Sequence, residues 1–142
     1  MDTNETHETA ARLRRAITLL NRRLRNSSLG GITPAQASIL AVIDNLGEPT
    51  LGEIAQAEQV QPPSVTRLVN QMESAGLITR HLDPEDRRLT RVALSAHGRK
   101  EIAGIRHRKT EFLERQISAL GEHEQKHVGD LVVFLEALLE SS

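Results

Sequence analysis

The sequence of 142 residues contains no cysteine, no tryptophan, no tyrosine and only two phenylalanines. The absence of cysteine excludes disulfides, thiolate metal sites, cysteine nucleophiles and thiol redox switches. Two aromatic rings are too few for the folds that bind single-stranded nucleic acid by stacking several bases on exposed aromatics. A formal charge of −1, from 18 basic and 19 acidic residues, argues against a nucleic-acid partner when it is taken alone.

Long apolar runs and targeting signals are also lacking. Residues 1–9 carry three acids and lack the basic-then-apolar order of a secretory signal. The longest uncharged run, residues 26–43, is interrupted by Pro34 and two glycines and cannot span a bilayer. We therefore expect a cytoplasmic protein without a membrane partner. Its length and its 38% hydrophobic residues suit one globular domain plus an oligomerisation element.

Apolar spacing and capping residues predict helices over most of the chain. Apolar residues recur at helical spacing between Leu13 and Leu24, which predicts a first helix over roughly residues 8–25. Segments 33–36 and 50–53 each combine a threonine cap with Gln or Glu three residues later, so they open a second helix ending at Gly47 and a short third helix. A proline pair opens a fourth helix that stops at Gly76. Its apolar stripe comprises Val65, Leu68, Val69 and Met72.

Alternating apolar residues after the fourth helix predict a β-hairpin. Ile78 and Leu82 lie on its outward strand, Val92 and Leu94 on its return strand, and residues 83–88 form a polar tip. Two longer helices follow, from a Ser95 cap to about residue 119 and over residues 122–140. Their expected inner residues are Ile102, Ile105, Phe112, Leu113 and Ile117 in the fifth helix, and Val128, Leu131, Val132, Leu135, Leu138 and Leu139 in the sixth.

This order of elements predicts a mainly α fold with six helices, a winged helix-turn-helix with a two-stranded β wing, and flanking dimerisation helices. We assign residues 1–32 to an N-terminal dimerisation helix, 33–95 to a DNA-binding domain and 96–142 to C-terminal dimerisation helices. The flanking helices are longer than a winged-helix core of about 60–70 residues needs. Their apolar stripes are therefore expected to meet a second copy of the chain.

Charge is strongly segregated along the chain. Residues 11–25 hold six arginines and no acid, whereas residues 44–60 hold four acids and no base. Arg67 lies on the free face of the predicted fourth helix, and Arg87 and Arg88 lie at the predicted hairpin tip. Arginine runs are usually only solvated, and that alternative stays open for any single run. Their coincidence with a recognition helix and a wing favours contact with DNA.

Two segments, Pro63 to Arg80 and Asp83 to Gly98, resemble the recognition-helix and wing signatures of the multiple antibiotic resistance regulator (MarR) family of winged-helix repressors. The six-helix plan extends this resemblance over nearly the whole chain. The resemblance implies a homodimer that binds double-stranded DNA at a pseudo-palindromic operator, more often as a repressor than as an activator. It implies no enzymatic activity, no catalytic residue and no cofactor.

The resemblance also implies roles for residues of the fourth helix. Ser64, Thr66 and Arg67 are expected to face the major groove, with Asn70 and Gln71 near its edge. The helix begins with two prolines, which removes two N–H donors and should weaken phosphate binding at the helix start. The full predicted DNA-binding set is Pro63, Ser64, Thr66, Arg67, Asn70, Gln71, Arg87, Arg88 and Arg91.

In the wing, the resemblance places Arg88 in the minor groove, where narrow A·T-rich tracts attract a cation. Arg87 and Arg91 are expected to meet phosphates. Asp86 is expected to orient Arg88 through a charge-assisted hydrogen bond, the alternative being an ordinary exposed turn residue.

Many members of the resembled family release DNA when a small, often aromatic or lipophilic anion binds between the DNA-binding and dimerisation helices. Such release requires the effector to prefer the conformation that does not fit the operator. The scarcity of aromatic residues favours an aliphatic pocket containing an arginine over a ring-stacked one.

Residues 123–127 satisfy the H-E-x-x-H pattern of zinc proteases, in which two histidines bind the metal and the glutamate is a general base. A catalytic zinc needs a third protein ligand and a substrate cleft, and the sequence offers no obvious candidate for either. We therefore expect a solvated surface and no metal. A regulatory metal site or a zinc hydrolase using His123 and His127 are the alternatives, and a winged-helix module used only for protein interaction is another.

Overall fold

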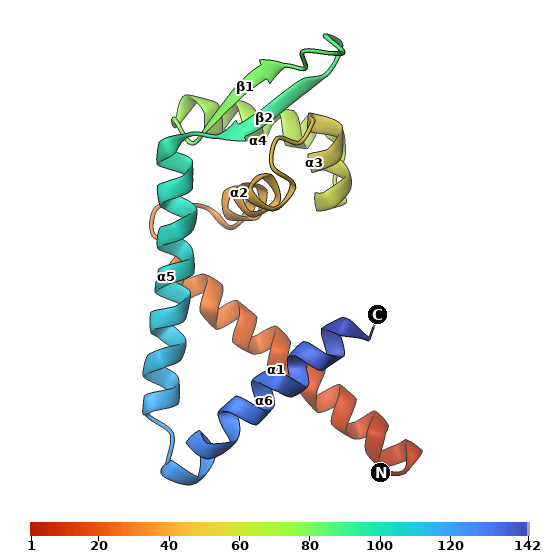
Figure 1. Ribbon diagram of the computed structural model, residues 1–142, viewed down its shortest axis with the longest axis vertical. Coiled ribbons are helices and arrows are strands. Elements are labelled where there is room, and N and C mark those ends of the chain that lie inside the picture. The colour runs from red at the N-terminus through yellow and green to blue at the C-terminus, as the bar shows by residue number, and fades with distance from the viewer. Residues whose placement is uncertain (142) are drawn as a thin grey trace.

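The computed structural model describes residues 1–141, which form six helices and one hairpin in two halves (Figure 1). The elements are α1 (Thr3–Ser28), α2 (Pro34–Leu46), α3 (Leu51–Glu58), α4 (Pro62–Ser74), β1 (Ile78–Leu82), β2 (Thr90–Leu94), α5 (Ala96–Ser118) and α6 (Glu122–Glu140). The winged-helix half comprises α2 to α4, the hairpin and the start of α5. The helical arm comprises α1, the rest of α5 and α6. The predicted mainly α, winged helix-turn-helix fold is confirmed.

Reciprocal side-chain caps start two of the helices. Thr33 and Gln36 form the predicted capping box at α2, with N–H···O distances of 3.1 and 3.2 Å. Asp2 and Glu5 form another at α1, with distances of 2.8 and 3.0 Å. The prediction that the first helix begins near residue 8 was therefore wrong, because this cap lets the helix start at Thr3.

The segment before α3 pairs with the hairpin as well as capping a helix. The Thr50 hydroxyl accepts from the Glu53 amide, but the Glu53 carboxylate bonds that hydroxyl and not the Thr50 backbone N–H. Thr50 also forms an antiparallel bridge with Arg91, and the Val92 amide donates to the Pro49 carbonyl at 2.9 Å. This short third edge was not predicted, and it ties the hairpin to the α2–α3 loop.

The recognition-helix candidate α4 and the long helix α5 are joined by close backbone contacts. At the end of α4 the Leu77 and Gly76 amides donate to the Met72 and Glu73 carbonyls, and Gly76 has φ +75°, as the predicted Schellman motif requires. Ser95 caps α5 and donates its hydroxyl to the Gly76 carbonyl. A Cβ on Gly98 would lie 2.0 Å from the Leu77 carbonyl oxygen, so only glycine permits this approach.

One apolar core closes the winged-helix half. Its buried cluster lies entirely between Ile39 and Ile102, and it includes Ile43, Val65 and Met72 with essentially no exposed surface. The hairpin pairs Ile78 with Leu94 and Leu82 with Thr90. Ile78 is buried, but Leu82 is 56% exposed. Leu82 is exposed because the outer end of the hairpin extends beyond the core (Figure 1).

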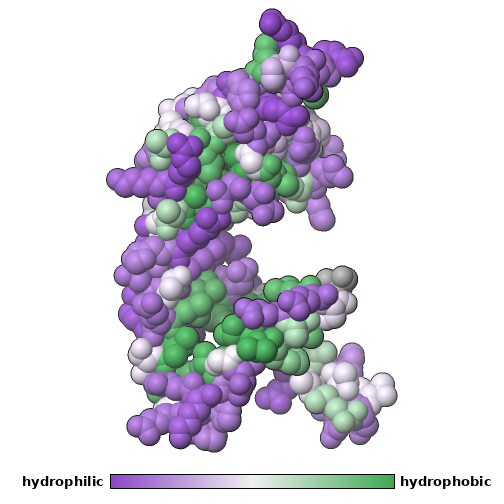
Figure 2. Space-filling model, viewed as in Figure 1, coloured by the Kyte–Doolittle hydropathy of each residue, from purple (hydrophilic) through white to green (hydrophobic). Residues whose placement is uncertain are grey.

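The helical arm leaves its apolar residues uncovered. None of the described side chains of α6 is buried, and Leu131 and Phe134 are 50% and 53% exposed. In α5, Ile102 and Ile105 are buried as predicted, whereas Phe112, Leu113 and Ile117 are half-buried. The predicted burial of the α6 residues is therefore wrong within one chain, because Val128 and Leu135 are only half-buried and the other four are exposed. Figure 2 shows this hydrophobic surface on the arm, while the wing end is mainly hydrophilic.

Candidate nucleic-acid interface

The exposed face of α4 carries every polar residue of this helix that the sequence analysis assigned to DNA. Val65, Val69 and Met72 are buried on the inner face. The opposite face exposes Pro63, Ser64, Thr66, Arg67, Asn70 and Gln71. The Arg67 guanidinium has no hydrogen bond or ion pair within residues 1–141, so its donors are available for an outside partner.

The start of α4 is poor in hydrogen-bond donors. Pro62 and Pro63 occupy its first two positions, and Gln61 provides no side-chain cap. The Thr66 hydroxyl donates to the Pro62 carbonyl at 3.1 Å, so it can offer only lone pairs to a ligand. The binding capacity of this face therefore rests on Ser64, Arg67 and the two amide side chains, and less on the helix terminus.

The loop of the hairpin is built around the Asp83 carboxylate, which is nearly buried. It accepts hydrogen bonds from the Glu85 and Asp86 amides at 2.8 and 2.9 Å and from Arg91 Nε at 2.5 Å. Arg91 Nη1 in turn donates to the Glu48 carbonyl at 2.8 Å. Two of the three guanidinium nitrogens of Arg91 are thus occupied in fixing the loop against the α2–α3 connection.

These hydrogen bonds set the charge state of the loop. The hydrogen bond from Arg91, followed by those from the two backbone amides, lowers the pKa of Asp83 from 3.8 to about 2. The same contact with Asp83 raises the pKa of Arg91 above its ordinary value. The anchor of the hairpin loop is therefore a fully ionised pair at neutral pH.

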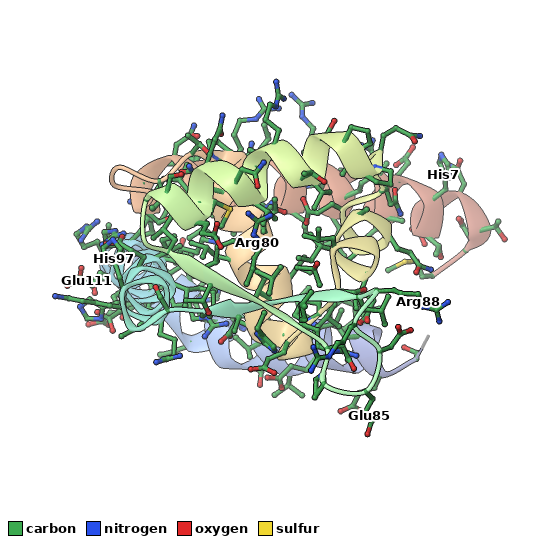
Figure 3. All side chains as sticks on the ribbon, turned by 90° about the horizontal axis from the view of Figure 1, so that it is seen from above. His7, Arg80, Glu85, Arg88, His97 and Glu111 are labelled. Atoms are coloured by element: carbon green, nitrogen blue, oxygen red, sulfur yellow. The ribbon has the colours of Figure 1, made fainter. Side chains whose placement is uncertain are left out.

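Arg88 lies at the exposed end of the same loop. Its Nε and Nη2 donate to the two Asp86 carboxylate oxygens at 3.0 and 3.1 Å, although 90% of its side chain is exposed. These bonds lower the pKa of Asp86 and raise that of Arg88. Figure 3 shows Arg88 projecting outward from the hairpin. The adjacent Arg87 has no partner within residues 1–141. The hairpin tip thus exposes one arginine oriented by a carboxylate, Arg88, and one without a partner in the described residues, Arg87.

Arg80 contributes to the site although the sequence analysis did not select it. It lies between α4 and the hairpin (Figure 3) and donates to both oxygens of Glu73 at 3.2 and 3.0 Å. The hydrogen bond from Arg80 lowers the pKa of Glu73. This pair joins the end of α4 to β1, and only the tertiary fold brings the two residues together.

A cleft of about 240 Å³ separates the winged-helix half from the arm. Its apolar walls include Leu29, Ile102 and Ile105, and α1 and α5 add cationic side chains. Those cations are Arg25, Arg106 and Lys109, and no acidic residue lines the cleft. Arg106 Nη2 lies 2.5 Å from an Asp44 oxygen, so one of the three cations already has a counter-ion. An amphipathic anion would match this lining.

Residues 1–141 contain neither a three-ligand metal centre nor a helix that could cross a bilayer. Within residues 1–141, no three histidine, aspartate or glutamate side chains gather closely enough to hold a metal ion. No helix in that range is both long and apolar enough to cross a bilayer. The Glu124 carboxylate of the H-E-x-x-H segment folds back over Gly121, 2.6 Å from where a Cβ on that glycine would lie.

Comparison with known proteins gives one consistent result. A family model described as the MarR family matches residues 32–90. The crystal structure of a proposed transcriptional regulator from Pseudomonas aeruginosa PA01 has 33% sequence identity and a TM-score of 0.82, covering 98% of both chains. An uncharacterized HTH-type transcriptional regulator of Mycobacterium bovis is 28% identical over 94% of each chain. The HTH-type transcriptional repressor MdtR of Bacillus subtilis is 28% identical, over 78% of this chain and 72% of its own length.

Proposed function

Because this chain belongs to the MarR family of HTH-type transcriptional regulators, we propose that it is a homodimeric repressor that binds pseudo-palindromic duplex DNA. The observation that carries the proposal is the gathering of Arg67, Arg87 and Arg88 at one end of the molecule. Two of them are unpaired within the described residues, and the third is held outward. Similarity to a repressor of Bacillus subtilis supports the direction of regulation.

In this proposal α4 enters the major groove. Ser64 and Arg67 contact base edges or phosphates, and Thr66 accepts hydrogen bonds because its own proton is already donated to Pro62. Asn70 and Gln71 lie near the groove edge, and Pro63 contacts the backbone without donating. The two prolines leave few N–H groups for phosphate, so recognition depends on side chains.

The wing reaches the minor groove through Arg88, held by Asp86, while Arg87 meets a phosphate. We assign Arg91 an indirect role, because its guanidinium is engaged with Asp83 and the Glu48 carbonyl. Arg91 then acts by fixing the angle at which the wing leaves the core.

The exposed arm supports the proposed dimerisation. A groove of about 660 Å³ lies between α1 and α6, lined mostly by apolar side chains that include Leu13, Ile17, Phe134 and Leu138. Exposed apolar patches of this kind mark interaction surfaces, and two-fold dimers are the commonest closed assemblies. Residues 1–32 and 96–142 would then form the dimerisation helices, and residues 33–95 the DNA-binding domain.

The cleft between the two halves is the site that we assign to an effector. Arg25 and Lys109 would bind a carboxylate, and Ile102 and Ile105 would contact its apolar body. An effector that favours one angle between the arm and the winged-helix half would change the distance between the two recognition helices.

Selection of bound duplexes from a random library tests the central proposal, followed by anisotropy titration of the recovered site. Arg67→Ala should cost about 1–3 kcal/mol and relax base preference, as expected for a lost guanine contact. Arg88→Ala should weaken binding and flatten its salt dependence, with a slope lower by about 1. Binding equal to wild type in both variants would contradict the proposal, and failure to recover any duplex would favour a module for protein interaction.

The effector assignment has a separate test. Hydrophobic carboxylates such as octanoate should reduce operator affinity, and Lys109→Ala or Arg25→Ala should make the protein less sensitive without weakening DNA binding itself. Unchanged sensitivity in both variants would remove the effector from this cleft. Arg12→Ala provides the control, because Arg12 is an exposed arginine of α1 that lies outside the cleft.

A further inference from the structure

The two histidines of the H-E-x-x-H segment contact each other although the catalytic pattern is not assembled. His123 and His127 lie one turn apart at the start of α6, with ring centroids 4.9 Å apart and ring planes at 77°. Both side chains are exposed. Neither has an ion pair or side-chain hydrogen bond within residues 1–141, so their ring nitrogens are available to a ligand.

The remaining histidines are in a different environment. His81, His97 and His107 each lie 3.3 to 4.0 Å from a glutamate oxygen, and His7 makes no such contact in the described part of the chain. His107 has the same helical spacing to Glu111 that His123 has to His127. Within residues 1–141, His123 and His127 are thus the one pair in which two imidazoles meet.

We propose that His123 and His127 form a bidentate chelate for a divalent transition-metal ion, with water filling the other coordination positions. Neutral imidazole is the commonest protein ligand for such ions, and side chains four residues apart on a helix are neighbours. The affinity order expected for two nitrogen ligands is Cu²⁺ above Ni²⁺ above Co²⁺. A chain without cysteine contains no thiolate to compete for the ion.

The position of the pair gives the chelate a structural effect. Helix α6 starts at Glu122, and its N-cap Gly121 provides no side-chain cap hydrogen bond, unlike the N-caps of α1, α2, α3 and α5. A metal ion bridging two successive turns fixes that start, because the ligands are brought together only in the helix. No third protein ligand is present within residues 1–141, so the site binds a metal without forming a three-ligand catalytic centre.

Isothermal titration of the tag-free chain with copper(II) chloride tests the proposal. We expect one Cu²⁺ per chain, with affinity roughly 100-fold lower in His123→Ala and in His127→Ala, since each variant loses the chelate. Binding should weaken as the pH falls, because protons compete for the ring nitrogens, and nickel(II) should bind less tightly than copper(II). His107→Ala is the control and should bind as wild type.

A variant designed to gain a metal site provides a second test. Glu111→His would give α5 the same spacing of two imidazoles, and it should add a second Cu²⁺ per chain. Far-UV circular dichroism verifies that each variant keeps its helices, as exposed helical positions should allow. Undiminished copper binding in both α6 variants, an equal loss in His107→Ala, or no binding to the wild-type chain would each overturn the proposal. None of these outcomes depends on DNA binding.

Discussion

The winged-helix half buries its apolar side chains within one chain, whereas the helical arm leaves most of its own exposed. The buried cluster runs from Ile39 to Ile102 and takes nothing from α1 or α6. Composition does not explain the contrast, because α6 carries as many large apolar residues as a core helix. The difference teaches that the two halves have different requirements for folding. One half closes its core within one chain, and the other leaves an apolar face exposed.

The arginines of the two halves also differ in how many have a partner within the chain. In the winged-helix half, Arg80, Arg88 and Arg91 each bond a nearby carboxylate. In α1, five of the six arginines have no partner within residues 1–141, and Arg23 lies over the Phe112 ring at 5.6 Å. Three arginines of the winged-helix half are therefore paired within the described part of the chain, whereas Arg67 and Arg87 are not. In the arm, all six arginines of α1 and most of the apolar residues of α6 are exposed.

The largest expected effect concerns the core. Ile43→Ala should lower the free energy of unfolding by about 2–5 kcal/mol, because it leaves a cavity in a fully buried site. Urea denaturation at low and high protein concentration should give the same loss. Leu131→Ala on α6 is the comparison, and its cost should grow with protein concentration as dimers form. A concentration-independent cost for Leu131→Ala would remove the contrast between the two halves.

The next effect concerns association. Phe134→Asp should raise the dissociation constant of the dimer on the order of 30-fold or more, since it places a charge in the apolar groove. Sedimentation equilibrium measures this directly. Gln56→Asp puts the same charge on α3 of the winged-helix half and should leave association unchanged. Equal association of both variants would show that the α1–α6 groove is not the dimer interface.

A smaller effect is expected in the wing. Asp86→Asn frees Arg88 while keeping an oxygen for the Arg88 amide, so the arginine loses only its preset orientation. The ratio of specific to non-specific DNA affinity should fall by less than about fivefold, as is usual for an exposed ion pair. Anisotropy titrations with operator and unrelated duplexes give this ratio. An unchanged ratio would mean that Asp86 is an ordinary turn residue.

The smallest effect at neutral pH concerns Asp83. Its pKa in the folded protein, about 2, lies below its ordinary value of 3.8, so its ionised form stabilises the folded wing. That contribution is complete above pH 3.8 and is lost as the pH falls through about 2. The amide resonances of Glu85 and Asp86 should move further over this range in wild type than in Asp83→Asn, in which the Asp86 carboxylate still titrates. Identical titration of the two proteins would contradict the assignment.

Local rules predicted the fold well where neighbours in sequence are neighbours in space. The Thr33 and Ser95 caps, the Schellman end of α4 and the hairpin are all set by residues a few positions apart. The exposure of the α6 face within one chain was missed because burial depends on what lies opposite in space. Periodicity identifies an apolar face but not the surface that covers it.

The candidate site also contains features that follow from local sequence and features that depend on distant residues. The exposed face of α4 follows from helical periodicity, and the Asp86–Arg88 bonds join residues two positions apart. The engagement of Arg91 was not foreseeable, since it depends on hairpin register and on a carbonyl 43 residues away. The role of Arg80 was missed for the same reason. The DNA contacts themselves remain predictions, to be tested by the variants above.

The close approach of Gly98 to the Leu77 carbonyl lets the long helix α5 carry a movement of the arm to the recognition helix. The 23 residues of α5 span about 34 Å at 1.5 Å per residue. One end is fixed to the recognition helix through Ser95 and Gly98, and the other lies in the arm. A tilt of about 5° at the arm would move the recognition helix by about 3 Å, close to the rise of one base pair. A small change of angle at the cleft, which lies midway along α5, would therefore shift the recognition helix by about one base pair along its DNA site.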